Sequence, residues 1–273
     1  MKLLLLTAMA AATLLGCAAP AEMTASAESM KDHLPVFAAG SLREAMTDIA
    51  RDYETRTGQK IALTFGASGL LREQIEKDDA AQVFASADIQ HPQRLANAGA
   101  WGAPAVFVRN SLCALTQANL KTAPATLLDT LLDPTVRLGT SMPKADPAGD
   151  YAWELFRKAD SVKAGAYATL DAKALKLTGG ADSPKAPAGR GTYAWVMDNN
   201  QADIFLTYCT NAVAAQKEVP RLAVVALPAN LQVGAAYGVT VKNGAHPAAA
   251  AFAKALLATP AQTTFARYGF GAP

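Results

Sequence analysis

The sequence predicts an α/β protein in which a mixed, mainly parallel sheet is flanked by helices. Short apolar segments typical of strands alternate with segments whose apolar residues recur every three or four positions, as in amphipathic helices. Several strands also run directly into a helix through small residues, as in VFAAGSLREAM (36–46) and LTFGASGLLREQI (63–75). Strands that alternate with helices form parallel sheets whose faces the helices cover. With 273 residues, 51% of them hydrophobic, the chain is long enough for one large domain or two medium ones.

The first half of the chain repeats this strand-to-helix unit. The strand expected at 35–40 leads into a helix at 41–57, which carries Leu42 and Met46 on one face and should end at Gly58. The other strands of this half are expected at 60–65, 81–87 and 105–116, and the other helices at 70–78 and 91–99.

The alternation restarts in the second half. Strands are expected at 136–141, 202–208, 222–228 and 235–241. Helices are expected at 125–133, 148–159, 166–175, 192–200, 247–259 and 261–270, with a Gly- and Pro-rich loop at 178–191.

Two lobes joined by strands are expected. The segment AVFVRNSLCALT (105–116) is long for one strand and is predicted to cross between them. No linker rich in Gly, Pro or charge separates the two halves of the chain. We therefore expect a first lobe formed by 34–110 and 225–273, and a second lobe formed by 111–224.

The N-terminus predicts export. In residues 1–16, Lys2 precedes an apolar run that ends in small residues, which is typical of a secretory signal peptide. The run is too short for a membrane span, which needs about 20 apolar residues. The motif LLGC resembles a bacterial lipobox and predicts a lipid on Cys17, whereas ordinary cleavage near APAE (19–22) is the alternative. Residues 17–33 are expected to form a polar tether, and the protein to be periplasmic or otherwise extracytoplasmic.

The charge distribution excludes one class of partner. Positive and negative side chains are interspersed, the formal net charge is +2, and no long basic stripe occurs, so nucleic acid is not an expected partner. Any attraction of an anion would have to come from local donors and not from the overall field of the protein.

The cysteines and histidines give no metal signature. Cys113 and Cys209 could pair in an oxidising compartment, or they could remain as two buried free thiols. His33, His91 and His246 are scattered, so no metal-binding cluster is expected.

Ser41 and Ser68 each lie at a junction where an expected strand is followed directly by an expected helix. The first amides of a helix lack internal partners and, with the helix dipole, attract an anion. Because successive parallel strands end on the same side, both turns should face one crevice. The alternative is an ordinary helix cap, which Glu44 favours for Ser41 through a capping-box pattern. A third such junction is DPAGDY (146–151), where a normal Asp cap followed by Pro is the alternative.

The signals for catalysis are weaker. Neither FGASGL nor LGTSMP has the spacing of a nucleophile elbow, and no His is obviously placed to activate a serine. Phosphate-loop and dinucleotide-binding fingerprints are also lacking from the sequence. We therefore expect neither a cofactor nor an enzymatic activity.

The chain from Pro35 onward resembles the substrate-binding proteins of molybdate ABC importers. The motifs that carry this resemblance, in order, are VFAAGSLREAM, LTFGASGLLREQI, AQVFASAD, DPAGDYAWELF, ADIFLTYCTNA and FARYGF. The resemblance implies a two-lobed periplasmic-binding-protein fold with the ligand cleft between the lobes. It also implies a monomer that captures a tetrahedral oxyanion, molybdate or tungstate, and delivers it to a membrane ABC permease without chemistry.

The ligand contacts of that family are carried over residue by residue. Its two serine hydroxyls match Ser41 of AAGSL and Ser68 of FGASG. Its backbone amide at a Pro-Ala-Gly helix start matches Ala148. Its tyrosine matches Tyr208 of IFLTYCTNA, for which the alternative is an aromatic side chain packed in the core.

The fifth contact departs from the family pattern. Where the family has an Asn-Val pair whose Val amide is a donor, this chain has Gly189 and Arg190. The Arg190 amide could still donate and its guanidinium could bind the oxyanion, or the side chain could point to solvent. Gly40 also stands where Ala or Ser is more usual. Two other hypotheses remain: the same fold with a sulfate-like, phosphate-like or organic anion, and a secreted serine hydrolase.

Overall fold

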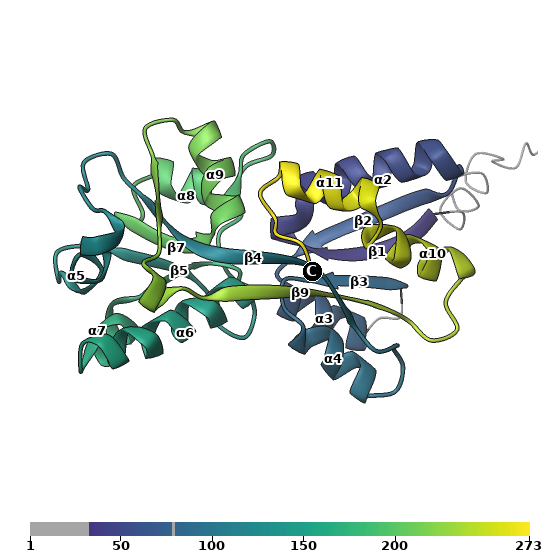
Figure 1. The fold of residues 1–273 in the computed structure, drawn as a ribbon, viewed down its shortest axis with the longest axis horizontal. Helices are drawn as coiled ribbons and strands as arrows, with labels where there is room; N and C mark the ends of the chain where they lie inside the picture. The colour runs from purple at the N-terminus through teal and green to yellow at the C-terminus, as the bar shows by residue number, and fades with distance from the viewer. Residues whose placement is uncertain (1–32, 78–79) are drawn as a thin grey trace, which may run out of the picture.

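The computed structural model describes residues 33–77 and 80–273. The expected signal peptide, Cys17 and the expected tether up to residue 32 lie outside the described residues. The described chain forms two lobes side by side, each with a sheet between helices (Figure 1). None of the helices in these ranges combines the length and apolar character of a membrane span. The same ranges contain no group of three or more His, Cys, Asp and Glu side chains that could hold a metal ion.

The first lobe has the strand order β2-β1-β3-β9, in which β2, β1 and β3 are parallel and β9 is antiparallel to β3. Helices α2 and α11 lie over one face of this sheet, and α3 and α4 lie over the other (Figure 1). The elements are β1 (His33–Ala39), β2 (Lys60–Gly66), β3 (Val83–Ser86), η1 (Gly40–Leu42), α2 (Arg43–Thr57), α3 (Ser68–Lys77), α4 (Gln90–Asn97), α10 (Pro247–Leu256) and α11 (Thr259–Arg267).

The second lobe has the strand order β4-β7-β5-β6, with β8 paired to β4. Helices α8 and α9 lie on one side of it, and α6 and α7 on the other (Figure 1). The elements are β5 (Leu138–Ser141), β6 (Leu175–Thr178), β7 (Ile204–Tyr208), β8 (Ala223–Ala226), η2 (Pro124–Thr126), α5 (Leu127–Leu132), α6 (Pro147–Val162), α7 (Ala166–Lys173), α8 (Thr192–Asp198), α9 (Cys209–Glu218) and η3 (Ala229–Leu231).

Strands β4 (Ala105–Thr116) and β9 (Gly234–Val241) join the lobes. The first half of β4 pairs with β9, and its second half pairs with β7 and β8, so the predicted crossing is confirmed. All antiparallel strand pairs in the described ranges involve β4 or β9. Because β8 pairs with β4 and η3 packs on α6, the chain returns to the first lobe along β9, later than the expected residue 225.

The predicted amphipathic helix shows how the first lobe is packed. Met46, Ile49 and Tyr53 of α2 are buried, and the ring of Tyr53 meets that of Phe252 edge-on with 5.1 Å between centroids. The helix ends at Gly58, whose φ of 75° is readily adopted only by glycine. Strand β6 was not expected: LKLT follows Ala174, whose extended backbone ends α7 early and lets the segment pair with β5.

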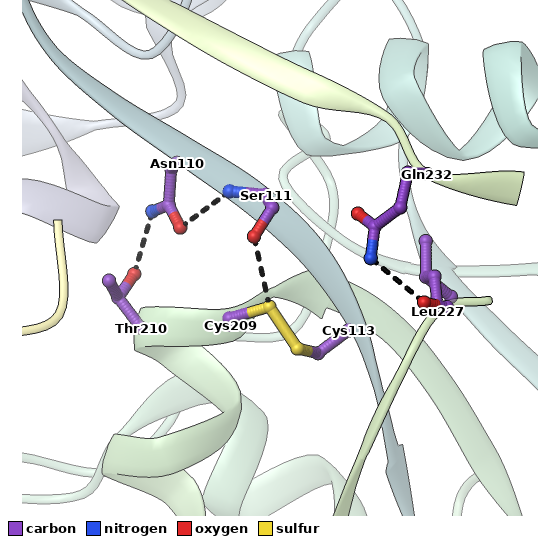
Figure 2. The surroundings of a disulfide bond; sticks show 7 residues. All are labelled: Asn110, Ser111, Cys113, Cys209, Thr210, Leu227 and Gln232. Carbon is purple, nitrogen blue, oxygen red and sulfur yellow. Dashed lines mark hydrogen bonds between the residues drawn. A yellow bond between two sulfur atoms is a disulfide. The ribbon is translucent and has the colours of Figure 1, made fainter. Parts of the chain in front are cut away.

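A disulfide joins Cys113 of β4 to Cys209, the first residue of α9 (Figure 2). Their Cα atoms are 4.8 Å apart, because Cys113 lies opposite Thr207 on the neighbouring strand, two residues before Cys209. Of the two alternatives left open by the sequence, the structure therefore has the bonded one. The bond fastens the end of β7 to the strand that connects the lobes.

Removing this disulfide is expected to destabilise the protein. Replacing Cys113 and Cys209 together by alanine, on a background with Cys17 replaced by serine, should lower the unfolding free energy by about 2–4 kcal/mol. The reason is that the bond closes a long loop, whose ends lie 96 positions apart in sequence. Urea denaturation measures the change, and the parent protein under reductant should unfold like the variant. Two free thiols in the unreduced, denatured parent would contradict the bond.

Candidate anion-binding site

The site begins at the carboxyl ends of three neighbouring parallel strands. Ala39 of β1 lies opposite Gly66 of β2, and Ala38 lies opposite Ala85 of β3. The segments that follow these strands therefore emerge at one edge of the sheet. They carry Ser41 in η1 and Ser68 at the start of α3, as well as Ala87.

Ser68 is buried, with 1% of its surface exposed. Its Oγ accepts a hydrogen bond from the backbone N–H of Ala87 at 3.0 Å. A hydroxyl that accepts one bond can still donate its own hydrogen to a ligand oxygen. The segment that follows β3 thus orients the serine that follows β2.

Ser41 does not cap α2. The helix has no side-chain cap, so the predicted capping box with Glu44 is wrong. The Ser41 Oγ lies instead 2.9 Å from Oη of Tyr237 in β9, a residue 196 positions away in sequence. Asn110 of β4 donates from Nδ2 to the same Oη at 3.3 Å. It also donates to Oγ1 of Thr210 at 2.9 Å (Figure 2). A long-range contact has taken the place of the local cap.

Tyr208 brings the second lobe to this edge. It is the last residue of β7, is 1% exposed, and donates from Oη to the carbonyl oxygen of Ala87 at 3.2 Å. Its ring centroid is 5.4 Å from that of Tyr237 and 6.1 Å from that of Tyr151. Burial raises the pKa of the Tyr208 phenol well above its usual range, so the hydroxyl stays protonated, and its one hydrogen is donated to the Ala87 carbonyl.

Contacts therefore connect three of the predicted site residues. We call Ser41, Ser68, Tyr208 and Tyr237 the hydroxyl cluster. Ala87 binds Ser68 through its N–H and Tyr208 through its carbonyl. The ring of Tyr208 packs against that of Tyr237, whose hydroxyl bonds to Ser41. Sequence reasoning missed Tyr237, because a tyrosine in the strand-like segment AAYGVTV has no feature that separates it from a core aromatic.

The predicted Ala148 donor lies at the start of α6, but its amide is already engaged. Asp146 accepts the Ala148 N–H through Oδ1 at 3.0 Å, and Pro147 occupies the first helical position. The cap that the sequence offered as the alternative is thus present. Tyr151, one turn along the same helix, packs against Tyr208, which places the start of α6 beside the hydroxyl cluster.

The structure does not bring Arg190 to the hydroxyl cluster. Its amide donates to the Pro187 carbonyl at 3.0 Å. Its guanidinium pairs with Asp198, at 2.9 Å, and with Glu218, and these residues line a hollow on the surface of the second lobe. Its pKa is raised by these two carboxylates. The described contacts of Arg190 therefore favour a role in joining α8 to α9.

The two lobes touch directly through backbone. The N–H of Gly69 in α3 donates to the carbonyl of Ala145 in the second lobe at 2.8 Å. A Cβ on Gly69 would lie 2.3 Å from the Lys144 oxygen and 2.7 Å from the Ala145 oxygen. Only glycine permits this approach, because both obstructing atoms belong to backbone that cannot swing aside.

Comparison with known proteins gives the family. The family model described as "Bacterial extracellular solute-binding protein" matches residues 34–271. The chain belongs to this family. It is an extracytoplasmic solute-binding protein of the ABC importer type, a class that binds a small ligand and a membrane permease.

Individual relatives differ in the anion that their names give. The molybdate-binding protein ModA of Escherichia coli is 32% identical over 248 residues, which are 87% of this chain and 88% of ModA. The periplasmic molybdate-binding protein of Azotobacter vinelandii has a TM-score of 0.68 at 19% identity, over 88% of this chain and 99% of its own. The sulfate-binding protein SubI of Mycobacterium tuberculosis has a TM-score of 0.70 at 16% identity, over 87% and 86%. These structures confirm the predicted fold class and leave the ligand open.

The close contact at Gly69 should control how tightly the lobes meet. Gly69→Ala is expected to hold them apart, because its Cβ would overlap the two carbonyl oxygens of the second lobe. Small-angle X-ray scattering should then give a larger radius of gyration than for the parent protein.

Gly40→Ala is the matched control, since it lies in the neighbouring turn and its Cβ would meet nothing closer than 3.8 Å. Its scattering should equal that of the parent. An unchanged radius of gyration for Gly69→Ala would show that this contact does not set the distance between the lobes.

Proposed function

We propose that this protein captures a tetrahedral oxyanion, molybdate or tungstate, between its lobes and delivers it to an ABC permease without catalysing a reaction. The observation that supports this most is the hydroxyl cluster, in which Ser41 and Ser68 of the first lobe meet Tyr208 of the second. The identity to ModA supports the choice of molybdate.

The cluster suits a small dianion. Hydroxyl groups donate hydrogen bonds without carrying a charge, and a buried anion is stabilised when each of its oxygens is hydrogen-bonded. Molybdate and tungstate have nearly the same size and charge, so one arrangement of donors should hold both. Sulfate is smaller, and fixed donors would reach it only through lengthened bonds.

Ligand entry needs the lobes to separate. Ser68 and Tyr208 are each 1% exposed, and the backbones of the two lobes are in contact at Gly69. Hinge motion about the β4 and β9 connections would open the site to solvent and close it around the anion. The closed form then presents surfaces of both lobes to a permease.

We further propose that the protein acts as a monomer outside the cytoplasm, with a lipid on Cys17 as its membrane anchor. The hydrogen-bond partners of Ser41 and Ser68 disfavour a hydrolase in which either serine is the nucleophile. These are a tyrosine hydroxyl and a backbone amide, and the described contacts of both serines include no histidine.

Calorimetric titration of the purified protein tests the proposed ligand. Molybdate and tungstate should bind at least about tenfold more tightly than sulfate, a difference of about 1.4 kcal/mol. If molybdate bound no more tightly than sulfate, the proposal that molybdate is the ligand would be wrong.

Single removals of hydroxyl groups test the proposed contacts. Ser41→Ala, Ser68→Ala and Tyr208→Phe should each weaken molybdate binding by about 10- to 100-fold, because each removes a hydrogen bond to a charged group. Ser161→Ala, an exposed hydroxyl on α6, is the control and should bind like the parent. Parent-like affinity in all three site variants would remove the hydroxyl cluster from the binding site.

Arg190→Ala decides between the two roles of that residue. If the ion pairs with Asp198 and Glu218 are its function, molybdate affinity should stay within about threefold of the parent, while the melting temperature falls slightly. A loss of about tenfold or more in affinity at unchanged melting temperature would instead place Arg190 at the ligand.

A further inference from the structure

A chain of hydrogen bonds connects Ser41 to the two strands that join the lobes. The Ser41 Oγ lies 2.9 Å from Oη of Tyr237 in β9, and Nδ2 of Asn110 in β4 donates to that Oη at 3.3 Å. Val108 of β4 lies opposite Tyr237, so Asn110, two residues further on, shares its face of the sheet and reaches the phenol diagonally. Tyr237 and Asn110 are buried, whereas Ser41 is only partly buried. The chain therefore runs from the interior to a hydroxyl that retains some exposure.

The contacts of Asn110 fix the direction of its amide. Its Oδ1 accepts the backbone N–H of Ser111 at 2.9 Å, and Nδ2 donates its other hydrogen to Oγ1 of Thr210 at 2.9 Å (Figure 2). The amide nitrogen donates only, so exchanging it with the oxygen would set two donors against each other at Ser111. Asn110 is therefore a donor to Tyr237 and cannot receive the hydrogen of its hydroxyl.

Tyr237 has one hydroxyl hydrogen, and Ser41 is positioned to accept it. Burial raises the pKa of Tyr237 well above its usual range, so the phenol keeps this hydrogen. Because Asn110 approaches the phenol oxygen as a donor, Ser41 is the remaining hydrogen-bond partner among the described contacts of that oxygen. A phenol is more acidic than an aliphatic hydroxyl and is thus the stronger donor of the two. With Oγ of Ser41 accepting from Tyr237, the serine's own hydrogen points away from the phenol.

Aromatic packing holds the phenol in this position. The ring centroid of Tyr237 lies 5.4 Å from that of Tyr208, 5.6 Å from that of Phe270 and 6.4 Å from that of Phe107. The rings of Phe270 and Phe107 meet it edge-on. The Tyr237 hydroxyl therefore cannot leave Ser41 without moving neighbouring rings of the core.

We propose, building on the function proposed above, that Asn110 and Tyr237 are positioning residues that direct the Ser41 hydrogen to an oxygen of the bound anion. The Asn110 amide turns the Tyr237 hydroxyl to Ser41, and each bond in the chain polarises the next, which makes Ser41 a stronger donor. The anion oxygen that faces Ser41 must then be an acceptor that carries no hydrogen. Ala87 plays the corresponding part for Ser68 through its backbone N–H.

A double-mutant cycle on molybdate affinity tests this inference, because Tyr237 acts on the anion through Ser41. Tyr237→Phe keeps the ring and removes the hydroxyl, and it should raise the Kd for molybdate about tenfold in calorimetric titration of the full protein. In the Ser41→Ala background the same change should raise Kd by less than about threefold, whereas a merely structural role would give the same factor in both backgrounds. Tyr193→Phe is the matched control, since it removes a buried hydroxyl that lies 3.3 Å from Oγ of Ser141 in the second lobe. Its Kd should equal that of the parent.

Asn110→Ala is the second variant, and it keeps the test decisive if Tyr237→Phe does not fold. It should also weaken molybdate binding, and this loss should disappear in the Ser41→Ala background. Parent-like affinity of the folded variant, or an equal loss with and without the Ser41 hydroxyl, overturns the inference and leaves the proposed function intact. If the parent protein does not bind molybdate, the proposed function falls and this inference falls with it.

Discussion

Parallel strands in one sheet end at the same edge, and the candidate site depends on this constraint. It places the segments after β1, β2 and β3 next to one another, so that the backbone of Ala87 can orient Ser68 and receive the hydroxyl of Tyr208. Because Tyr208 comes from the second lobe, its hydrogen bond to Ala87 is also a contact between the two lobes.

The parts that the sequence predicted are those governed by local rules. Alternating apolar segments predicted the strands, and the three-to-four spacing in α2 predicted which side chains are buried. Parallel pairing then placed Ser41 and Ser68 together without any knowledge of distant contacts. The unusual length of the 105–116 segment was enough to predict a strand shared by two lobes.

The parts that it missed depend on residues far apart in the chain. Ser41 and Glu44 fit a capping box, yet Ser41 bonds to Tyr237, because tertiary packing supplied a partner that local pattern could not reveal. In the sequence, Gly69 is simply a small residue near the start of a helix. Only the approach of the Ala145 backbone in the structure explains why a side chain is excluded there. Its spacing from Tyr208 aligned Arg190 with a ligand contact of the family, but in the structure its guanidinium pairs with Asp198 and Glu218. Likewise, the pairing of Cys113 with Cys209 required the register of β4 against β7.

A crystal structure of the protein with molybdate, measured with anomalous scattering from the molybdenum atom, tests the proposed convergence most directly. The account predicts one anomalous peak between the lobes, with the oxyanion within hydrogen-bonding distance of the Ser41, Ser68 and Tyr208 hydroxyls. A peak on the outer surface of either lobe, such as the hollow beside Arg190, with no molybdenum near these three hydroxyls, would contradict it.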